Sequence, residues 1–170
     1  MDIKDAYLNL IDRATANLER VPVLSPAQLN THPGGHPNSA AWNLWHAGRV
    51  LDVMGVSALA GQPQVWEEQD YRSSFGLGEA GEQSGFGHSP AAAAAIVIED
   101  RDLLVAYITD ALTALRTYVG SITPTDFAKV IGEFQGAPQT VQGRLSLILI
   151  DALQHVGMVQ YISGIPELGR

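Results

Sequence analysis

The sequence predicts an all-α protein, a four-helix bundle with two long connections. Three observations point to this fold class. Four stretches near residues 2–19, 39–60, 99–119 and 140–163 carry apolar residues at spacings of three and four, as a buried helix face requires. No stretch alternates convincingly as a strand would. The connections at residues 61–89 and 120–139 are long enough to permit an order other than simple up-down-up-down.

The composition fits one globular domain spanning residues 1–170. Hydrophobic residues make up 46% and charged residues 16%, which is typical of a chain with a full-sized core. The net charge of −8 argues against nonspecific nucleic-acid binding, which depends on clustered Lys and Arg. The absence of Cys excludes disulfides, thiolate zinc sites and a cysteine nucleophile. We find neither a signal-peptide layout nor an apolar run of membrane-spanning length, and we expect a cytoplasmic protein with no membrane partner.

The first helix is expected from Asp2 to Leu18, where apolar residues form a single stripe. Ser25-Pro26 predicts a short helical turn, because serine caps a helix and proline suits its first position. Residues 33–37, Pro-Gly-Gly-His-Pro, predict a loop.

The second helix begins at Asn38 or Ser39, since either side chain can cap it, and ends at Gly61. Its inward stripe contains Trp42, Trp45 and His46. Tryptophans at helical spacing are more often part of a core, although these two could also line a substrate pocket.

The segment from Gln62 to Ser89 is the longest irregular part of the chain. It is rich in glycine and carries four aromatic residues, which argue against disorder because they have to be buried. We expect the segment to be ordered, with Trp66 and Phe86 packed on the bundle or on a partner subunit. Ser89-Pro90 then predicts another short helical start.

The third helix is expected from Glu99 to Val119, with Gly120 ending it, and Thr123-Pro124 predicts a short turn. Residues 132–139 are expected to form a loop. The fourth helix is capped by Thr140 and ended by Gly164-Ile165-Pro166. Its residues 147–150, Leu-Ile-Leu-Ile, are apolar around nearly the full circumference, so we expect a symmetric homodimer that covers part of the exposed apolar surface.

Asp151 and His155 are four residues apart on the fourth helix and share one face, close to its apolar stripe. A carboxylate there needs a partner, and a divalent metal is one. A buried Asp–His ion pair, or an Asp that points to solvent, would explain the same residues. His46 faces inward on the second helix, and a lone inward histidine is often a hydrogen-bonded core residue. Together, however, the three predict a catalytic metal site with open coordination positions.

Two segments resemble those of DinB-like proteins. Residues 38–49, which contain Trp45, His46 and Arg49, look like the family's Trp-His-x-x-Arg segment, and residues 151–157, Asp-Ala-Leu-Gln-His-Val-Gly, look like its late His-x-x-x-His-x-Gly segment. Residues 84–90 also resemble linkers of this group. The resemblance implies a four-helix bundle with crossed connections, three residues that bind a divalent metal, and frequent homodimers. Asp151 departs from the pattern, because the family usually has histidine there, and its isomerase branch has glutamate.

Characterised members of that family include transferases that use mycothiol or bacillithiol and mycothiol-dependent maleylpyruvate isomerases. The resemblance therefore implies a transferase that activates a low-molecular-weight thiol for attack on an electrophilic substrate, with zinc or nickel at His46, Asp151 and His155. A metal with open positions could equally activate water for hydrolysis. A non-enzymatic dimeric metal-binding stress-response module is the third possibility.

Three further residues lie where they could serve such a site. Arg49 is a candidate anchor for a substrate carboxylate, or a structural ion-pair partner of Asp52 or another acid. His36 and His88 lie in loops that could approach the mouth of the site, where either could act as a general base. Loop histidines without a role are common, so neither belongs to the predicted metal site.

Overall fold

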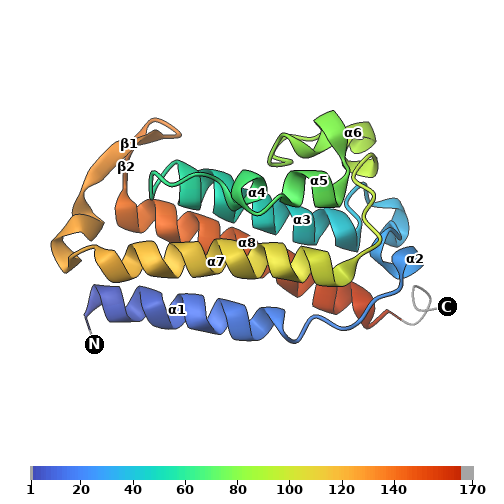
Figure 1. Cartoon of the computed structure of the whole chain (residues 1–170), viewed down its shortest axis with the longest axis horizontal. Helices are drawn as coiled ribbons and strands as arrows, with labels where there is room; N and C mark the ends of the chain where they lie inside the picture. Colours follow the sequence, from blue (N-terminus) through green and yellow to red (C-terminus); the bar gives the residue numbers. More distant parts are fainter. Residues whose placement is uncertain (1, 166–170) are drawn as a thin grey trace.

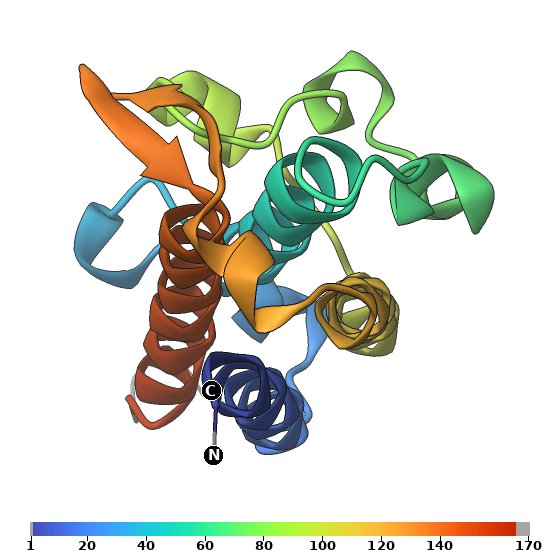
Figure 2. The ribbon, with the colours of Figure 1, turned by 90° about the vertical axis from the view of Figure 1, so that its left-hand side faces the viewer.

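Four long helices form the body of the protein, in a computed structural model that describes residues 2–165 (Figure 1). They are α1 (Ile3–Leu18), α3 (Ala40–Val50) with its π-helical continuation η2 (Leu51–Ser57), α7 (Arg101–Ser121) and α8 (Val141–Ser163). Viewed along the bundle, the four surround one shared core (Figure 2). The predicted all-α bundle is confirmed.

The crossed order of the helices is also confirmed. Hydrogen bonds join Tyr7 to Ser146 and Gln160 to Asn17, so α1 and α8 run in the same direction. Asn43 of α3 bonds to His155 of α8, whereas Met54 of η2 bonds to Arg144, so these two elements are antiparallel. The long segment after η2 returns the chain to the end at which α3 begins (Figure 1), and α7 therefore runs parallel to α3.

Side-chain caps set the helix beginnings where sequence reasoning placed most of them. Ser39, rather than Asn38, caps α3, and Thr140 caps α8. The third helix begins two residues later than predicted, because Asp100 caps it with hydrogen bonds to two amides. Gly120 does not end it; the helix continues to Ser121 and stops at Ile122, just before the extended Thr123 that precedes Pro124. Pro166, expected beyond the end of α8, lies outside the described residues.

The prediction of a loop at residues 132–139 is wrong. Strands β1 (Val130–Phe134) and β2 (Ala137–Thr140) form an antiparallel hairpin. Gln135 and Gly136 make its two-residue turn, and both have positive φ, at 51° and 79°. Such a turn follows the twist of paired strands, and Gly136 supplies one of its two left-handed positions at no steric cost.

The segment between η2 and α7 is ordered, as predicted. It contains the short helices α4 (Val65–Glu68), α5 (Tyr71–Phe75), η3 (Gly78–Gly81) and α6 (Pro90–Ala94). Trp66 is 1% exposed and stacks on Phe75 with ring centroids 5.3 Å apart. Phe86 is 86% exposed, so the expectation that it packs on the bundle is wrong within this chain. The remaining short helices, α2 (Pro26–Leu29), η1 (Pro33–Gly35) and η4 (Pro124–Ala128), cover the ends of the bundle.

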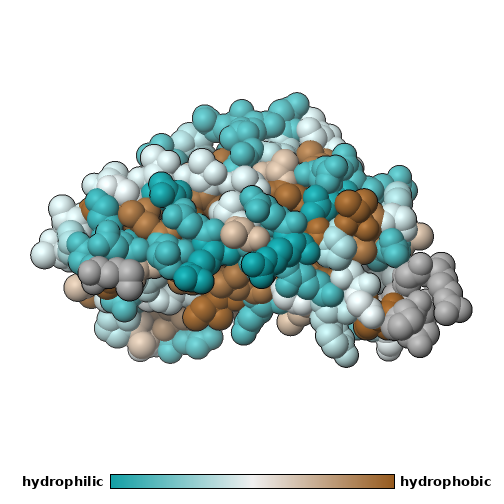
Figure 3. Space-filling model, turned by 90° about the horizontal axis from the view of Figure 1, so that it is seen from below, coloured by the Kyte–Doolittle hydropathy of each residue, from teal (hydrophilic) through white to brown (hydrophobic). Residues whose placement is uncertain are grey.

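Helix α8 corrects the statement that the sequence has no apolar run of membrane-spanning length. By length and apolar composition alone, α8 could cross a membrane. In the bundle it packs along α3, α1 and η2, as the core helix of a soluble protein does. Its outer face nevertheless exposes Ile150, Met158 and Tyr161. On another face, seen from below, apolar patches are scattered among hydrophilic side chains (Figure 3).

Candidate metal centre

The three predicted ligands converge where α3 and α8 pack against each other. One potential ligand atom from each of His46, Asp151 and His155 lies within 4.8 Å of the other two. Asp151 Oδ2 is 3.6 Å from His46 Nε2, and Asp151 Oδ1 is 3.8 Å from His155 Nε2. In a tetrahedral site with bonds of about 2.1 Å, ligand atoms lie about 3.4 Å apart, so these side chains could hold a divalent ion with little movement.

Hydrogen bonds fix both imidazoles in the form that a metal requires. His46 Nδ1 donates to the carbonyl oxygen of Ser84 at 2.5 Å, and His155 Nδ1 donates to Asn43 Oδ1 at 2.7 Å. The amide of Asn43 cannot turn round, because its Nδ2 donates to the carbonyl oxygen of Ser39. With the proton on Nδ1, each histidine directs the lone pair of Nε2 toward Asp151.

Asp151 supplies the observation that tests whether a cation fits. Its side chain is 31% exposed, yet Oδ2 is buried and has no hydrogen-bond partner among the described residues. The neighbouring Nε2 atoms cannot donate, since their protons are on Nδ1. Oδ2 lies nearest the lone pair of His46 and Oδ1 nearest that of His155, and a partly buried carboxylate that faces two lone pairs is electrostatically unfavourable. A positive ion between the three groups removes the repulsion. The donor set of two imidazoles and one carboxylate suits zinc or nickel.

Burial disfavours the charged form of each of the three groups. It lowers the pKa of His46, which the Ser84 carbonyl and Asp151 partly offset. Burial and the neighbouring His46 lower the pKa of His155 to about 4, and burial raises the pKa of Asp151. At neutral pH both histidines are therefore uncharged, and a metal need not displace their protons.

Trp42 forms the inner wall of the centre. Its ring stacks on His46 with centroids 4.6 Å apart and meets the ring of His155 edge-on at 5.7 Å. Trp42 and Trp45 are both buried, as residues of a core are, so the core interpretation holds and Trp42 lines the site as well. Trp42 Nε1 donates to Nδ1 of His88, which places His88 at the rim, where sequence reasoning left its role open.

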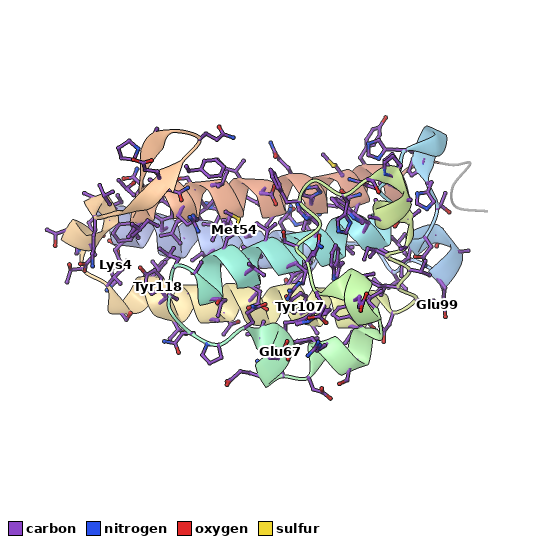
Figure 4. The ribbon with its side chains drawn as sticks, turned by 90° about the horizontal axis from the view of Figure 1, so that it is seen from above. Lys4, Met54, Glu67, Glu99, Tyr107 and Tyr118 are labelled. Carbon is purple, nitrogen blue, oxygen red and sulfur yellow. The ribbon has the colours of Figure 1, made fainter. Side chains whose placement is uncertain are left out.

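Residues 82–89, which we call the strap, cross from η3 to α6 above α3 (Figure 4). Ser84 in the strap accepts the hydrogen bond from His46. Gly85 has φ of +88°, and a Cβ atom there would lie 2.9 Å from Trp45 and 3.0 Å from Nδ1 of His46. Only glycine allows the strap to pass this close to the ligand.

Arg49 anchors the strap instead of facing an open site. It is 2% exposed and donates to the carbonyl oxygens of Glu82 and Gln83 at 3.1 and 3.3 Å. Its guanidinium lies over the ring of Trp66 and 4.0 Å from the carboxylate of Asp52. These contacts favour the structural alternative for Arg49 over the predicted substrate anchor.

Sequence reasoning missed the groups that orient the ligands. Asn43 could have been found, since it is polar and lies three residues before His46 on an inward helix face. The Ser84 carbonyl carries no sequence signal, because every residue has a carbonyl group.

His36 does not join the three predicted ligands. It lines a neighbouring groove of about 470 Å³, together with Asn43 and Met158. A larger cavity of about 620 Å³, lined by Val56 and Tyr118 among others, includes none of the three ligands.

The fold and the site together define a crossed four-helix bundle with a cluster of two histidines and one aspartate, which could hold a metal, between two antiparallel helices. The model of the DinB superfamily matches residues 10–159, so the chain belongs to that superfamily. A solved structure described as the conserved protein of a locus from Enterococcus faecalis is similar, with a TM-score of 0.83 and 28% identity over 95% of each chain. No curated protein matches the chain.

Proposed function

We propose that the protein is a metal-dependent transferase that activates a low-molecular-weight thiol for attack on an electrophilic substrate. His46, Asp151 and His155 would hold the divalent metal, zinc or nickel. The observation that carries the proposal is the Asp151 carboxylate, which faces two imidazole lone pairs and whose buried Oδ2 has no hydrogen-bond partner among the described residues. The chain has no Cys, so a thiol nucleophile has to come from a small molecule. Family membership supports the metal site.

The residues around the centre have different roles in binding the metal and in orienting its ligands. Asn43 and Ser84 hold the two imidazoles with Nδ1 protonated, which keeps both Nε2 atoms available to a cation. Asp151 contributes the one negative charge, and Trp42 excludes water from the inner side. When bound, a divalent metal lowers the pKa of a coordinated thiol, which supplies a nucleophile at neutral pH. Three protein ligands leave positions for a small molecule.

The same proposal includes a cytoplasmic location and a symmetric homodimer. Cellular low-molecular-weight thiols are kept reduced in the cytoplasm, where such a transferase would find its co-substrate. The apolar residues exposed on the outer face of α8, Ile150, Met158 and Tyr161, supply a surface that a second copy could cover.

Metal analysis and two activity assays test the proposal. Purified protein is analysed for metal and titrated with zinc and nickel, beside His155→Gln and a control, His32→Gln, which changes an exposed loop histidine. Conjugation of monochlorobimane is measured with and without added cysteine, and hydrolysis of p-nitrophenyl acetate is measured without thiol. We expect thiol- and metal-dependent conjugation that is lost in His155→Gln and kept in His32→Gln.

Each alternative has its own result in these assays. Ester hydrolysis without thiol, and no conjugation, would replace the transferase with a hydrolase. Metal binding without either activity would favour a non-enzymatic module, and no metal binding at micromolar concentration would remove the metal site.

A further inference from the structure

Arg144 lies on the same face of α8 as the metal centre. It precedes Asp151 by seven residues, close to two helical turns, which places it about 10 Å along the helix axis from Asp151. This face of α8 packs against α3 and η2, and we call the line of contact between them the seam. Asn43 meets His155, His46 meets Asp151, and the carbonyl oxygen of Met54 meets Arg144. Figure 4 shows Met54 where η2 runs beside α8.

In the part of the chain that the structure describes, the positive charge of Arg144 has no acidic partner. Within residues 2–165 no carboxylate oxygen lies within 4.0 Å of its guanidinium, which is bound to neutral oxygens. The other arginines withdrawn from solvent differ, since Arg49 has Asp52 at 4.0 Å and Arg101 has Asp102 at 2.8 Å. Arg144 also lies in the first turn of α8, where the helix dipole is positive. Half-burial lowers its pKa, with no opposing charge to offset it.

Arg144 has hydrogen-bond donors to spare. A guanidinium carries five N–H groups. Nε and Nη2 donate to Oε1 of Gln139 at 2.7 and 2.5 Å, and Nη1 reaches the Met54 carbonyl only at 3.5 Å. One N–H on Nη1 and one on Nη2 remain, which is the number that a carboxylate or a phosphate accepts from arginine in a bidentate pair.

Half-buried apolar side chains lie close to Arg144. Leu147 follows it by three residues on α8, and Met54, whose carbonyl oxygen contacts Arg144, lies on η2 beside Val53 in sequence; all three are half-buried. A molecule that spans this seam would contact apolar side chains in its middle and a positive charge at its end.

We propose that Arg144 binds the anionic group, carboxylate or phosphate, of a ligand whose reacting end lies at the His46, Asp151 and His155 centre. The inference rests on the proposed function and adds a substrate class to it. The ligand is an elongated molecule with an anion about 10 Å from the reacting atom and an apolar part between them. In a chain of net charge −8, an uncompensated arginine is a selective attractor for such a group.

Thiols with and without a terminal charge test the assignment. Cobalt-loaded protein is titrated with ω-mercaptooctanoate and with ω-mercaptooctanol, and binding is followed by the cobalt absorption spectrum. We expect the carboxylate to bind about tenfold tighter or more, since a charged bidentate pair is worth that factor. In Arg144→Gln the ratio falls to about one and the alcohol binds as before. Arg13→Gln, an exposed arginine on α1, keeps the wild-type ratio.

A second measurement separates this proposal from the proposed function. Metal-free protein is titrated with octanoate, octyl phosphate and octanol while the Arg144 Nε–H resonance is followed by NMR. If neither thiol changes the cobalt spectrum, the proposed thiol activation fails. The NMR titration of the metal-free protein then decides by itself whether Arg144 binds an anion. A saturable shift with an anion and none with octanol supports the anion site, and the stronger of the two anions identifies the group. No shift with either anion overturns it, as does an equal affinity for the two thiols in the wild type.

Arg144→Lys covers the case in which the glutamine variant does not fold. Lysine keeps the charge and loses the bidentate donor geometry of the guanidinium. We therefore expect the ratio of the affinities for ω-mercaptooctanoate and ω-mercaptooctanol to fall but to stay above one. A preference as large as in the wild type would contradict a bidentate contact.

Discussion

Replacing Asp151 by asparagine should stabilise the metal-free protein while it weakens metal binding. Among the described residues, Oδ2 of Asp151 is buried without a hydrogen-bond partner and lies nearest the lone pair of His46, while Oδ1 lies nearest that of His155. An asparagine of the same shape has no charge, and its NH2 group can donate to one of those nitrogens. The change therefore removes a repulsion that only a cation relieves.

The size of the stability change follows from the missing hydrogen bond of Oδ2. A buried polar group without a partner costs about 1–3 kcal/mol, and each kcal/mol moves the melting temperature of a domain of this size by roughly 2–4 °C. We expect Asp151→Asn to melt several degrees higher than the wild type in chelator. With saturating zinc the order should reverse, because a metal at a hundred times its Kd adds about 2.7 kcal/mol to the wild type.

Asp52→Asn is the matched control, since Asp52 is the other buried carboxylate of this region. It is 0% exposed and accepts hydrogen bonds from the amides of Val65 and Trp66 and from the hydroxyl of Tyr107. Asparagine would turn an NH2 group toward these donors, so this variant should lose about 3–5 kcal/mol with or without zinc. Urea unfolding of all three proteins in chelator and in zinc measures the differences. If Asp151→Asn is destabilised in chelator by more than about 1 kcal/mol, Asp151 forms a structural ion pair with the histidines and the reasoning is refuted.

Three other predictions concern the same centre and the dimer. Asn43→Ala removes the acceptor of His155 Nδ1, and zinc affinity should fall about 10–100-fold in a competition titration; an unchanged affinity would show that Asn43 does not orient the ligand. The pKa of His155 is lowered to about 4 in the folded protein, below its ordinary value of about 6.5, so the unfolded chain takes up the proton first. The stability of the metal-free protein should therefore fall as pH drops from about 6.5 to about 4 in urea titrations, and less steeply in His155→Gln; equal slopes would contradict the lowered pKa. Sedimentation at micromolar concentration should give a dimer that Ile150→Glu dissociates, whereas a species of 18.2 kDa for the wild type would exclude it.

The long helices and the ligand positions could be predicted because both follow from spacing. A buried face repeats every three to four residues, and Asp151 and His155 share a face at any point of a regular helix. The caps Ser39 and Thr140 could be found because capping depends on one side chain. These features need no knowledge of the tertiary structure.

The hairpin and the position of Phe86 depend on contacts that spacing does not contain. Strands β1 and β2 are short and mostly exposed, so no alternation of buried and exposed residues marks them. The turn uses Gln135 in a left-handed conformation, where Asn or Asp is the more familiar signal. Phe86 sits between two glycines of positive φ, and its ring is exposed to solvent.

The contacts between Arg49 and the strap were only partly predictable from the sequence. Arg49 was singled out by its sequence distance from His46, and its role followed only from the structure, in which it donates hydrogen bonds to the carbonyl oxygens of Glu82 and Gln83. Those two residues precede Ser84, whose carbonyl fixes the tautomer of His46. A buried arginine beside Asp52 thus connects to His46, a predicted metal ligand, through three successive backbone positions. The Trp-His-x-x-Arg spacing has a physical reason in this chain, because the arginine has to lie one turn beyond the histidine to hold the segment that orients it.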